Sequence, residues 1–144
     1  MSSYILIDKS VDDKSWWSEL IKTCAVVGDT FEIHCWSDEN DAVKLALQYG
    51  RKVTSSWHDG TVITGIITKD FLGFLADMPK PSEGEPYNKM TPFFTIQFGN
   101  TLSSEHYGSE VIISKVPNGK TSIVDRIIKK LERCAVVHRN IRCH

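Results

Sequence analysis

Several sequence features that would indicate a particular function are missing from this sequence. No hydrophobic run approaches the roughly 20 residues that a transmembrane helix needs. The phosphate-binding patterns GxGxxG and GxxxxGK[ST] are absent, and so is the nucleophile pattern GxSxG. The first residues show no basic segment followed by an apolar core, the mark of a secretory signal. These absences argue against nucleotide binding, hydrolase chemistry of that type and secretion, and we expect a soluble, cytoplasmic protein without a cofactor.

Glycine and proline are also scarce, with 9 and 5 residues among 144, which excludes a collagen-like or low-complexity chain. Hydrophobic residues make up 41% and charged residues 24%, as in ordinary globular proteins. A chain of this length forms one main core. We therefore predict a single globular domain over residues 1–144, with an exposed proline-rich loop at about 79–92 and a mobile tail at 135–144.

The four cysteines do not form a recognisable disulfide or zinc framework. Cys24 and Cys35 lie in apolar stretches and are expected to be buried, reduced thiols. Near the end of the chain, Cys134, His138 and Cys143 offer the thiolate and imidazole ligands that suit zinc. They lack the paired CxxC of a standard finger, so they remain candidates only and we predict no metal site.

Hydrophobic periodicity predicts four helices and about six strands. Helical spacing and end signals favour helices at 15–24, at about 38–49 after Ser37 as the N-cap, at 69–77 and at 121–134. Apolar runs and alternation favour strands at 4–7, 30–36, 52–57, 61–68, 93–98 and 110–114, with 135–137 as a candidate edge strand. The stretch 99–109 is polar and is expected to be a connection.

The strands at 52–57 and 61–68 flank His58, Asp59 and Gly60. Asp-Gly between β-rich runs is a strong signal for a tight hairpin, because both residues tolerate positive φ. Hairpins mixed with helical connections favour an α+β fold, in which helices pack on a largely antiparallel or mixed sheet.

Charge is distributed unevenly along the chain. Residues 1–110 contain 9 Lys and Arg against 16 Asp and Glu, whereas residues 111–144 contain 8 against 2. This separation of charge can produce an electric field that steers a charged partner over about one Debye length, roughly 8–10 Å. Alternatively, the basic last helix packs on an acidic body and the two charges balance each other within the fold. Both interpretations are compatible with the sequence.

Acidic residues recur beside tryptophan at helix starts and turns. Exposed carboxylates with aromatic anchors suit binding to a basic protein. The residues that we expect in such an interface are Asp38, Glu39, Asp41, Trp57, His58 and Asp59. Helix capping and turn formation would explain several of the same carboxylates without any partner.

Two other functions remain open. A small enzyme could assemble its site from His58, Asp59 and His106 together with the loop 79–92. A nucleic-acid accessory protein could use the basic helix at 121–134, although this helix lacks interleaved aromatic residues and the chain has a pI near 6.5.

In its size, its acidic first three quarters and its lack of a reaction motif, the chain resembles the bacterial immunity proteins of polymorphic and contact-dependent-inhibition toxin systems. The resemblance implies a small cytoplasmic antitoxin that binds one cognate toxin stoichiometrically and blocks it. Many such toxins are nucleases, so it further implies that an acidic surface covers a basic active site. The basic last helix departs from this picture.

Overall fold

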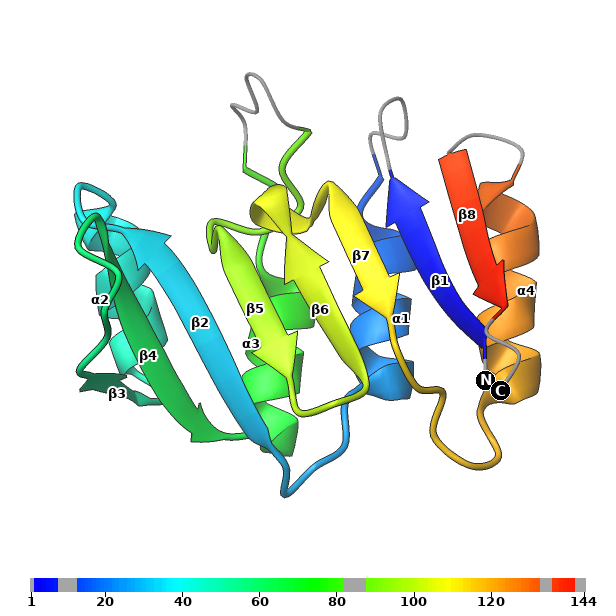
Figure 1. The fold of residues 1–144 in the computed structure, drawn as a ribbon, viewed down its shortest axis with the longest axis horizontal. Coiled ribbons are helices and arrows are strands. Elements are labelled where there is room, and N and C mark those ends of the chain that lie inside the picture. The colour runs from blue at the N-terminus through cyan, green and yellow to red at the C-terminus, as the bar shows by residue number, and fades with distance from the viewer. Residues whose placement is uncertain (1, 8–12, 82–87, 133–135, 142–144) are drawn as a thin grey trace.

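The computed structural model describes residues 2–7, 13–81, 88–132 and 136–141, and for 2–7 and 136–141 it describes the backbone alone. Figure 1 shows the arrangement of the elements, which follow one another along the chain in this order: β1 (Ser2–Ile7), α1 (Ser15–Cys24), β2 (Thr30–Trp36), α2 (Asn40–Leu47), β3 (Arg51–Val53), β4 (Gly60–Ile66), α3 (Lys69–Asp77), β5 (Thr95–Phe98), β6 (Leu102–Glu105), the short 3-10 turn η1 (His106–Gly108), β7 (Glu110–Ile113), α4 (Thr121–Leu131) and β8 (Val136–Ile141).

The strands form one sheet in the order β3-β4-β2-β5-β6-β7-β1-β8, and every neighbouring pair is antiparallel. All four helices cover the same face, and the opposite face carries no helix among the described residues (Figure 1). The predicted α+β class with a largely antiparallel sheet is confirmed. The described part of the chain contains eight strands: β6 was not expected, whereas β8 overlaps the candidate edge strand at 135–137 and lies at an edge of the sheet.

β6 was missed because its sequence, Leu-Ser-Ser-Glu, does not alternate between apolar and polar residues. Ser104 takes a core position, paired in register with Ile96 and fully buried. Its hydroxyl oxygen accepts a hydrogen bond of 3.1 Å from the indole Nε1 of Trp17. A buried hydroxyl is tolerated where it is hydrogen-bonded, so a polar residue can stand in the core face of a strand here.

The β3–β4 hairpin is present, but its connection is longer than the tight turn predicted from Asp-Gly. The paired residues end at Val53 and Val62, so the chain between them forms a loop. Gly60 is required there because a Cβ atom would lie 2.0 Å from the ring of Trp57. Helix α2 also departs from expectation, since its N-cap is Glu39 rather than Ser37.

The core lies between the helices and the covered face of the sheet. Alternation along β2 buries Phe31, Ile33 and Cys35 and leaves Glu32, His34 and Trp36 on the opposite face. Phe31 stacks on Phe71 of α3, with the two ring centroids 4.0 Å apart. Cys24 and Cys35 are buried free thiols, as predicted. No helix within the described ranges is long and apolar enough to cross a membrane.

Candidate functional site

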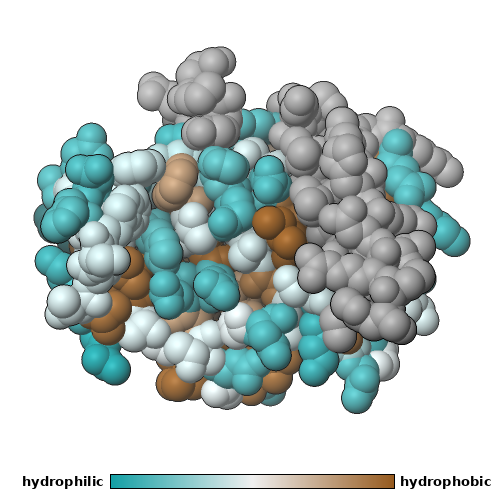
Figure 2. All heavy atoms as spheres, in the orientation of Figure 1, coloured by the Kyte–Doolittle hydropathy of each residue, from teal (hydrophilic) through white to brown (hydrophobic). Residues whose placement is uncertain are grey.

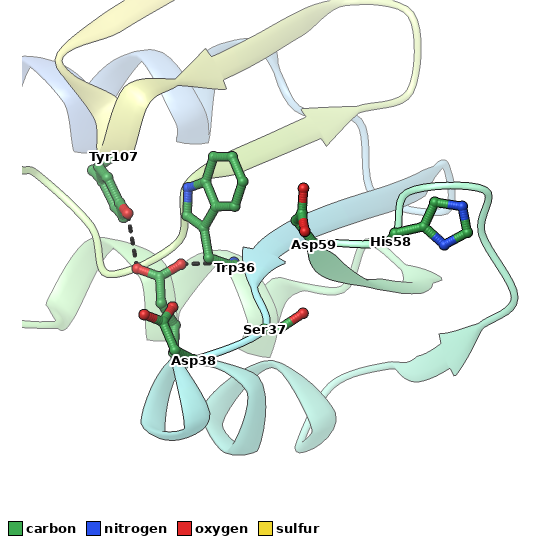
Figure 3. A pocket seen from close by; sticks show the side chains of 7 residues that line it. Trp36, Ser37, Asp38, His58, Asp59 and Tyr107 are labelled. Atoms are coloured by element: carbon green, nitrogen blue, oxygen red, sulfur yellow. Dashed lines mark hydrogen bonds between the residues drawn. The ribbon is translucent and has the colours of Figure 1, made fainter.

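A pocket of about 720 Å³ opens at the end of β2, where the strand leads into α2. Figure 3 shows the side chains that line it. We call it the acidic pocket, and its lining consists of Trp36, Ser37, Asp38, Glu39, His58, Asp59 and Tyr107. Three of these side chains are carboxylates, and neither lysine nor arginine is among the described residues of the lining.

Antiparallel pairing of β2 and β4 brings the two acidic turns together. Trp36, the last residue of β2, is paired with Gly60, the first residue of β4. Beyond this pair, the backbone N–H of Ser37 donates a hydrogen bond of 2.9 Å to the carbonyl oxygen of Asp59. The turn before α2 and the turn before β4 are thereby fixed side by side, with their carboxylates on one rim.

Glu39 is the most constrained carboxylate of the acidic pocket. Its Oε1 accepts a hydrogen bond of 2.8 Å from the backbone N–H of Trp36, and its Oε2 accepts one of 2.8 Å from the hydroxyl of Tyr107 (Figure 3). Hydrogen bonds to a charged acceptor are stronger than neutral ones. Glu39 therefore connects the end of β2 to η1, on the other side of β5.

Tyr107 lies in a turn whose backbone angles are rarely adopted by residues other than glycine, and its side chain lines the acidic pocket. His106 and Tyr107 have φ angles of 51° and 61°, and Gly108 follows at 85°. Positive φ costs a non-glycine residue on the order of 1 kcal/mol, and such residues gather at functional sites. Three backbone hydrogen bonds hold the turn, because the carbonyl of Tyr107 accepts from Met90 and Thr91 and its N–H donates to Phe94.

A row of aromatic rings extends from the acidic pocket across the sheet. Trp36 meets Trp57 edge to face at 5.0 Å between centroids, and it meets Phe94 at 5.1 Å. Phe94 in turn contacts Tyr107 at 5.2 Å and His106 at 5.7 Å. Trp36, Trp57 and Phe94 are partly exposed and present a preorganised apolar surface beside the carboxylates, whereas Tyr107 is buried.

The structure places the six residues expected in a partner interface at one end of the molecule. Asp38, Glu39, His58 and Asp59 line the acidic pocket itself. Asp41 lines a second, neighbouring pocket of about 400 Å³, which shares Asp38 and Glu39 with the first. The sixth residue, Trp57, packs against Trp36. The acidic pocket therefore gathers residues that the sequence could only place in separate turns.

The residues of the enzyme alternative are not gathered in the same way. The imidazole of His58 points away from the other labelled side chains of the acidic pocket (Figure 3). His106 contacts Phe94 and Glu110 and is not part of the pocket lining. A general acid and base must both reach one reacting atom. Part of the loop 79–92, residues 82–87, lies outside the described residues.

None of the three candidate metal ligands has a described side chain. Cys134 and Cys143 lie outside the described residues, and for His138 only the backbone is described, as a residue of β8 paired with Ile5. Within the described part of the chain, no group of three or more His, Cys, Asp or Glu side chains could hold a metal ion. The basic residues of α4 lie at the opposite end of the sheet from α2 (Figure 1).

The face of the sheet without helices carries a second group of ionisable residues. Hydrophobic and hydrophilic residues are interspersed on this face (Figure 2). On β2, the Nε2 atom of His34 lies 2.6 Å from Oε1 of Glu32. On β6, Oε2 of Glu105 is buried and has no hydrogen-bond partner among the described residues.

Glu105 is directly opposite Glu110 in the β6–β7 register. Burial raises the pKa of the Glu105 carboxyl, and the charge of Glu110 raises it further. His106, His34 and a hydrogen bond with Thr95 act in the opposite direction on this pKa. Glu105 also lines a small groove of about 180 Å³ along β5 and β6.

Sequence reasoning missed Tyr107, which lines the acidic pocket, and Phe94, which contacts both Trp36 and Tyr107. They come from segments far along the chain from β2 and α2, and no local pattern connects them. Comparisons with protein-family models, with curated proteins and with solved structures find no match for this chain.

Proposed function

We propose that this chain is a stoichiometric protein-binding inhibitor, an immunity protein that neutralises one cognate bacterial toxin, and that the acidic pocket is the centre of its binding surface. The observation that carries the proposal is the gathering of Asp38, Glu39 and Asp59 around Trp36. Aromatic anchors flanked by charges of one sign are typical of protein-binding surfaces.

The charge of the pocket suggests the chemistry of the partner. Asp38, Asp41 and Asp59 are exposed, so a partner can approach all three without a rearrangement of the fold. A nuclease concentrates lysine and arginine where it binds phosphates. An anionic surface with rigid aromatic rings beside it would complement such a basic active site and would speed the encounter by electrostatic steering.

The test begins with affinity capture of the partner from the source organism at low and moderate salt. A captured protein counts in favour only if it stops growth when expressed alone in a bacterial host and growth returns when this chain is co-expressed. We expect a one-to-one complex by light scattering. A partner whose toxicity is unchanged by co-expression would refute the inhibitor function.

The interface is tested with matched charge variants. Asp38→Asn, Asp41→Asn and Asp59→Asn together remove three carboxylates at the acidic end and leave the constrained Glu39 in place. The control combines Glu19→Gln, Asp70→Asn and Asp77→Asn, which remove three exposed carboxylates from α1 and α3.

We expect the first triple variant to weaken partner binding by about tenfold to a hundredfold, mostly through a slower association rate at low salt. The control triple variant should bind within about twofold of the unmodified chain. Equal losses in both variants would show that only net charge matters and that the acidic pocket is not the interface.

A further inference from the structure

Lys89 holds an ammonium group beside the acidic pocket, against the ring of Tyr107. Its Nζ atom lies 4.1 Å from the centroid of the Tyr107 ring, a distance typical of a cation–π contact. The next residue fixes this position, because the backbone N–H of Met90 donates a hydrogen bond of 2.8 Å to the carbonyl of Tyr107. Lys89 lines the second pocket together with Asp38, Glu39 and Asp41.

The surroundings of Lys89 are those of a cation site. No described carboxylate forms an ion pair with its ammonium group. The ring beneath it belongs to Tyr107, whose hydroxyl donates to Glu39. An aromatic face joined to a carboxylate is the combination that a guanidinium group satisfies best, because it stacks on the ring and forms paired hydrogen bonds with the carboxylate.

We propose that the acidic pocket receives one arginine side chain of the partner, and that Lys89 is an internal cation that competes with this arginine for Tyr107 and Glu39. The inference rests on the proposed function and names the anchor that the partner would supply. In the free protein, Lys89 occupies the aromatic face of the Tyr107–Glu39 pair. When an arginine enters, the guanidinium replaces it and Lys89 moves toward solvent.

If Lys89 competes with the incoming arginine, removal of the Lys89 side chain should tighten the binding of that arginine. The probes are N-acetyl-L-arginine methylamide, its lysine counterpart and its citrulline counterpart, which is nearly isosteric with arginine but neutral. Each is titrated into the ¹⁵N-labelled full chain and followed by NMR. We expect arginine to shift the signals of residues 36–39, 59 and 107 and the indole signal of Trp36, lysine to act more weakly, and citrulline to leave them unchanged.

Variants separate competition from net charge. Lys89→Gln removes the competing cation, and Lys44→Gln removes an equal charge from an exposed position on α2. We expect Lys89→Gln to bind the arginine probe about two- to fivefold more tightly, which corresponds to the loss of one exposed cation–π contact. Lys44→Gln should change affinity less than twofold, and Lys89→Arg, which puts a guanidinium in the place of the ammonium, should bind the probe no more tightly than the unmodified chain.

The result that would overturn the inference is equal binding of arginine and citrulline, or an affinity in Lys89→Gln no higher than in Lys44→Gln. The dispersion of the variant spectra shows directly whether each variant is folded. The probe titration needs no toxin, so its failure is distinguishable from failure of the proposed function. If a toxin is neutralised and the arginine probe does not bind, the proposed arginine anchor is wrong. If the probe binds and no captured protein is neutralised, the arginine anchor is supported and the inhibitor function is refuted.

Discussion

Replacing Glu105 with glutamine should make the protein more stable at neutral pH. The carboxylate has a buried oxygen without a hydrogen-bond partner among the described residues, and it is directly opposite Glu110. Like charges facing each other across two strands are destabilising, and so is a buried charge without a partner. Glu105→Gln removes the charge with little change in size, so the repulsion from Glu110 and the cost of burying a charge are relieved, although a polar atom stays at the buried position.

The expected gain is modest because Glu105 is only partly buried. An unsatisfied buried polar group costs about 1–3 kcal/mol, and solvent screening of a partly exposed carboxylate reduces that figure. We therefore expect the free energy of unfolding to rise by about 0.5–1 kcal/mol at pH 7. For a chain of this length that corresponds to an increase in Tm of about 1–3 °C.

The dependence on pH follows from the raised pKa of Glu105, whose ordinary value is 4.5. Because the folded state holds the proton more tightly than the unfolded state, protonation stabilises the fold below about pH 4.5, and this contribution is lost as pH rises through the folded pKa. The glutamine variant has no proton to lose at this position. Its stability advantage should therefore be small at pH 4 and grow toward neutral pH.

The assay is urea unfolding of both proteins between pH 4 and pH 8, with Glu19→Gln as an exposed control that should change nothing. A cycle with Glu110→Gln measures the repulsion, since the two gains should sum to more than the gain of the double variant. A glutamine variant that is less stable at pH 7, or an advantage that is the same at every pH, would refute the reasoning.

Three other predictions concern the strained turn and the buried thiols. Tyr107→Phe should lower the free energy of unfolding by about 1–2 kcal/mol, because Glu39 loses a charge-assisted hydrogen bond of 2.8 Å, and chemical denaturation checks this. Gly108→Ala should cost about 2–4 kcal/mol in the same assay, since φ is 85° and a Cβ atom would lie 2.8 Å from Cβ of Met90; a loss below 1 kcal/mol would contradict the geometry. Burial raises the pKa of Cys24 to about 11 and that of Cys35 to about 12, so site-resolved alkylation at pH 8 should label both thiols at the rate of unfolding, and rapid labelling in the folded state would be inconsistent with their burial.

Much of the fold could be predicted from local patterns. The period of two along 30–36 correctly separates the buried Phe31, Ile33 and Cys35 from the opposite face. The predicted inward residues of the last helix include Val124 and Ile128, which are fully buried. Such patterns predict the fold well because the residues on the buried face of each element are apolar and recur with the period of that element.

The sequence could not predict features that depend on distant partners. Ser104 is acceptable in the core face of β6 only because Trp17 donates a hydrogen bond to it. The acidic pocket depends on Tyr107, which lies 68 residues from its partner Glu39 and adopts positive φ without being glycine. The carboxylates could be recognised as a candidate group, but their arrangement around Trp36 required the register of β2 and β4.

The position of β1 in the sheet has a consequence for how the chain folds as it leaves the ribosome. β1 comes first in the sequence, yet its neighbours are β7 and β8, and Ser2 is paired in register with Ile141. Contacts between residues so far apart slow folding, because the ends of a long loop must be brought together first. The strands β2 to β5 can pair during synthesis, whereas β1 stays without either neighbour until β7 is made and is paired on both sides only after β8 is made. The half of the sheet that contains β1 is therefore expected to form after the half that contains β2.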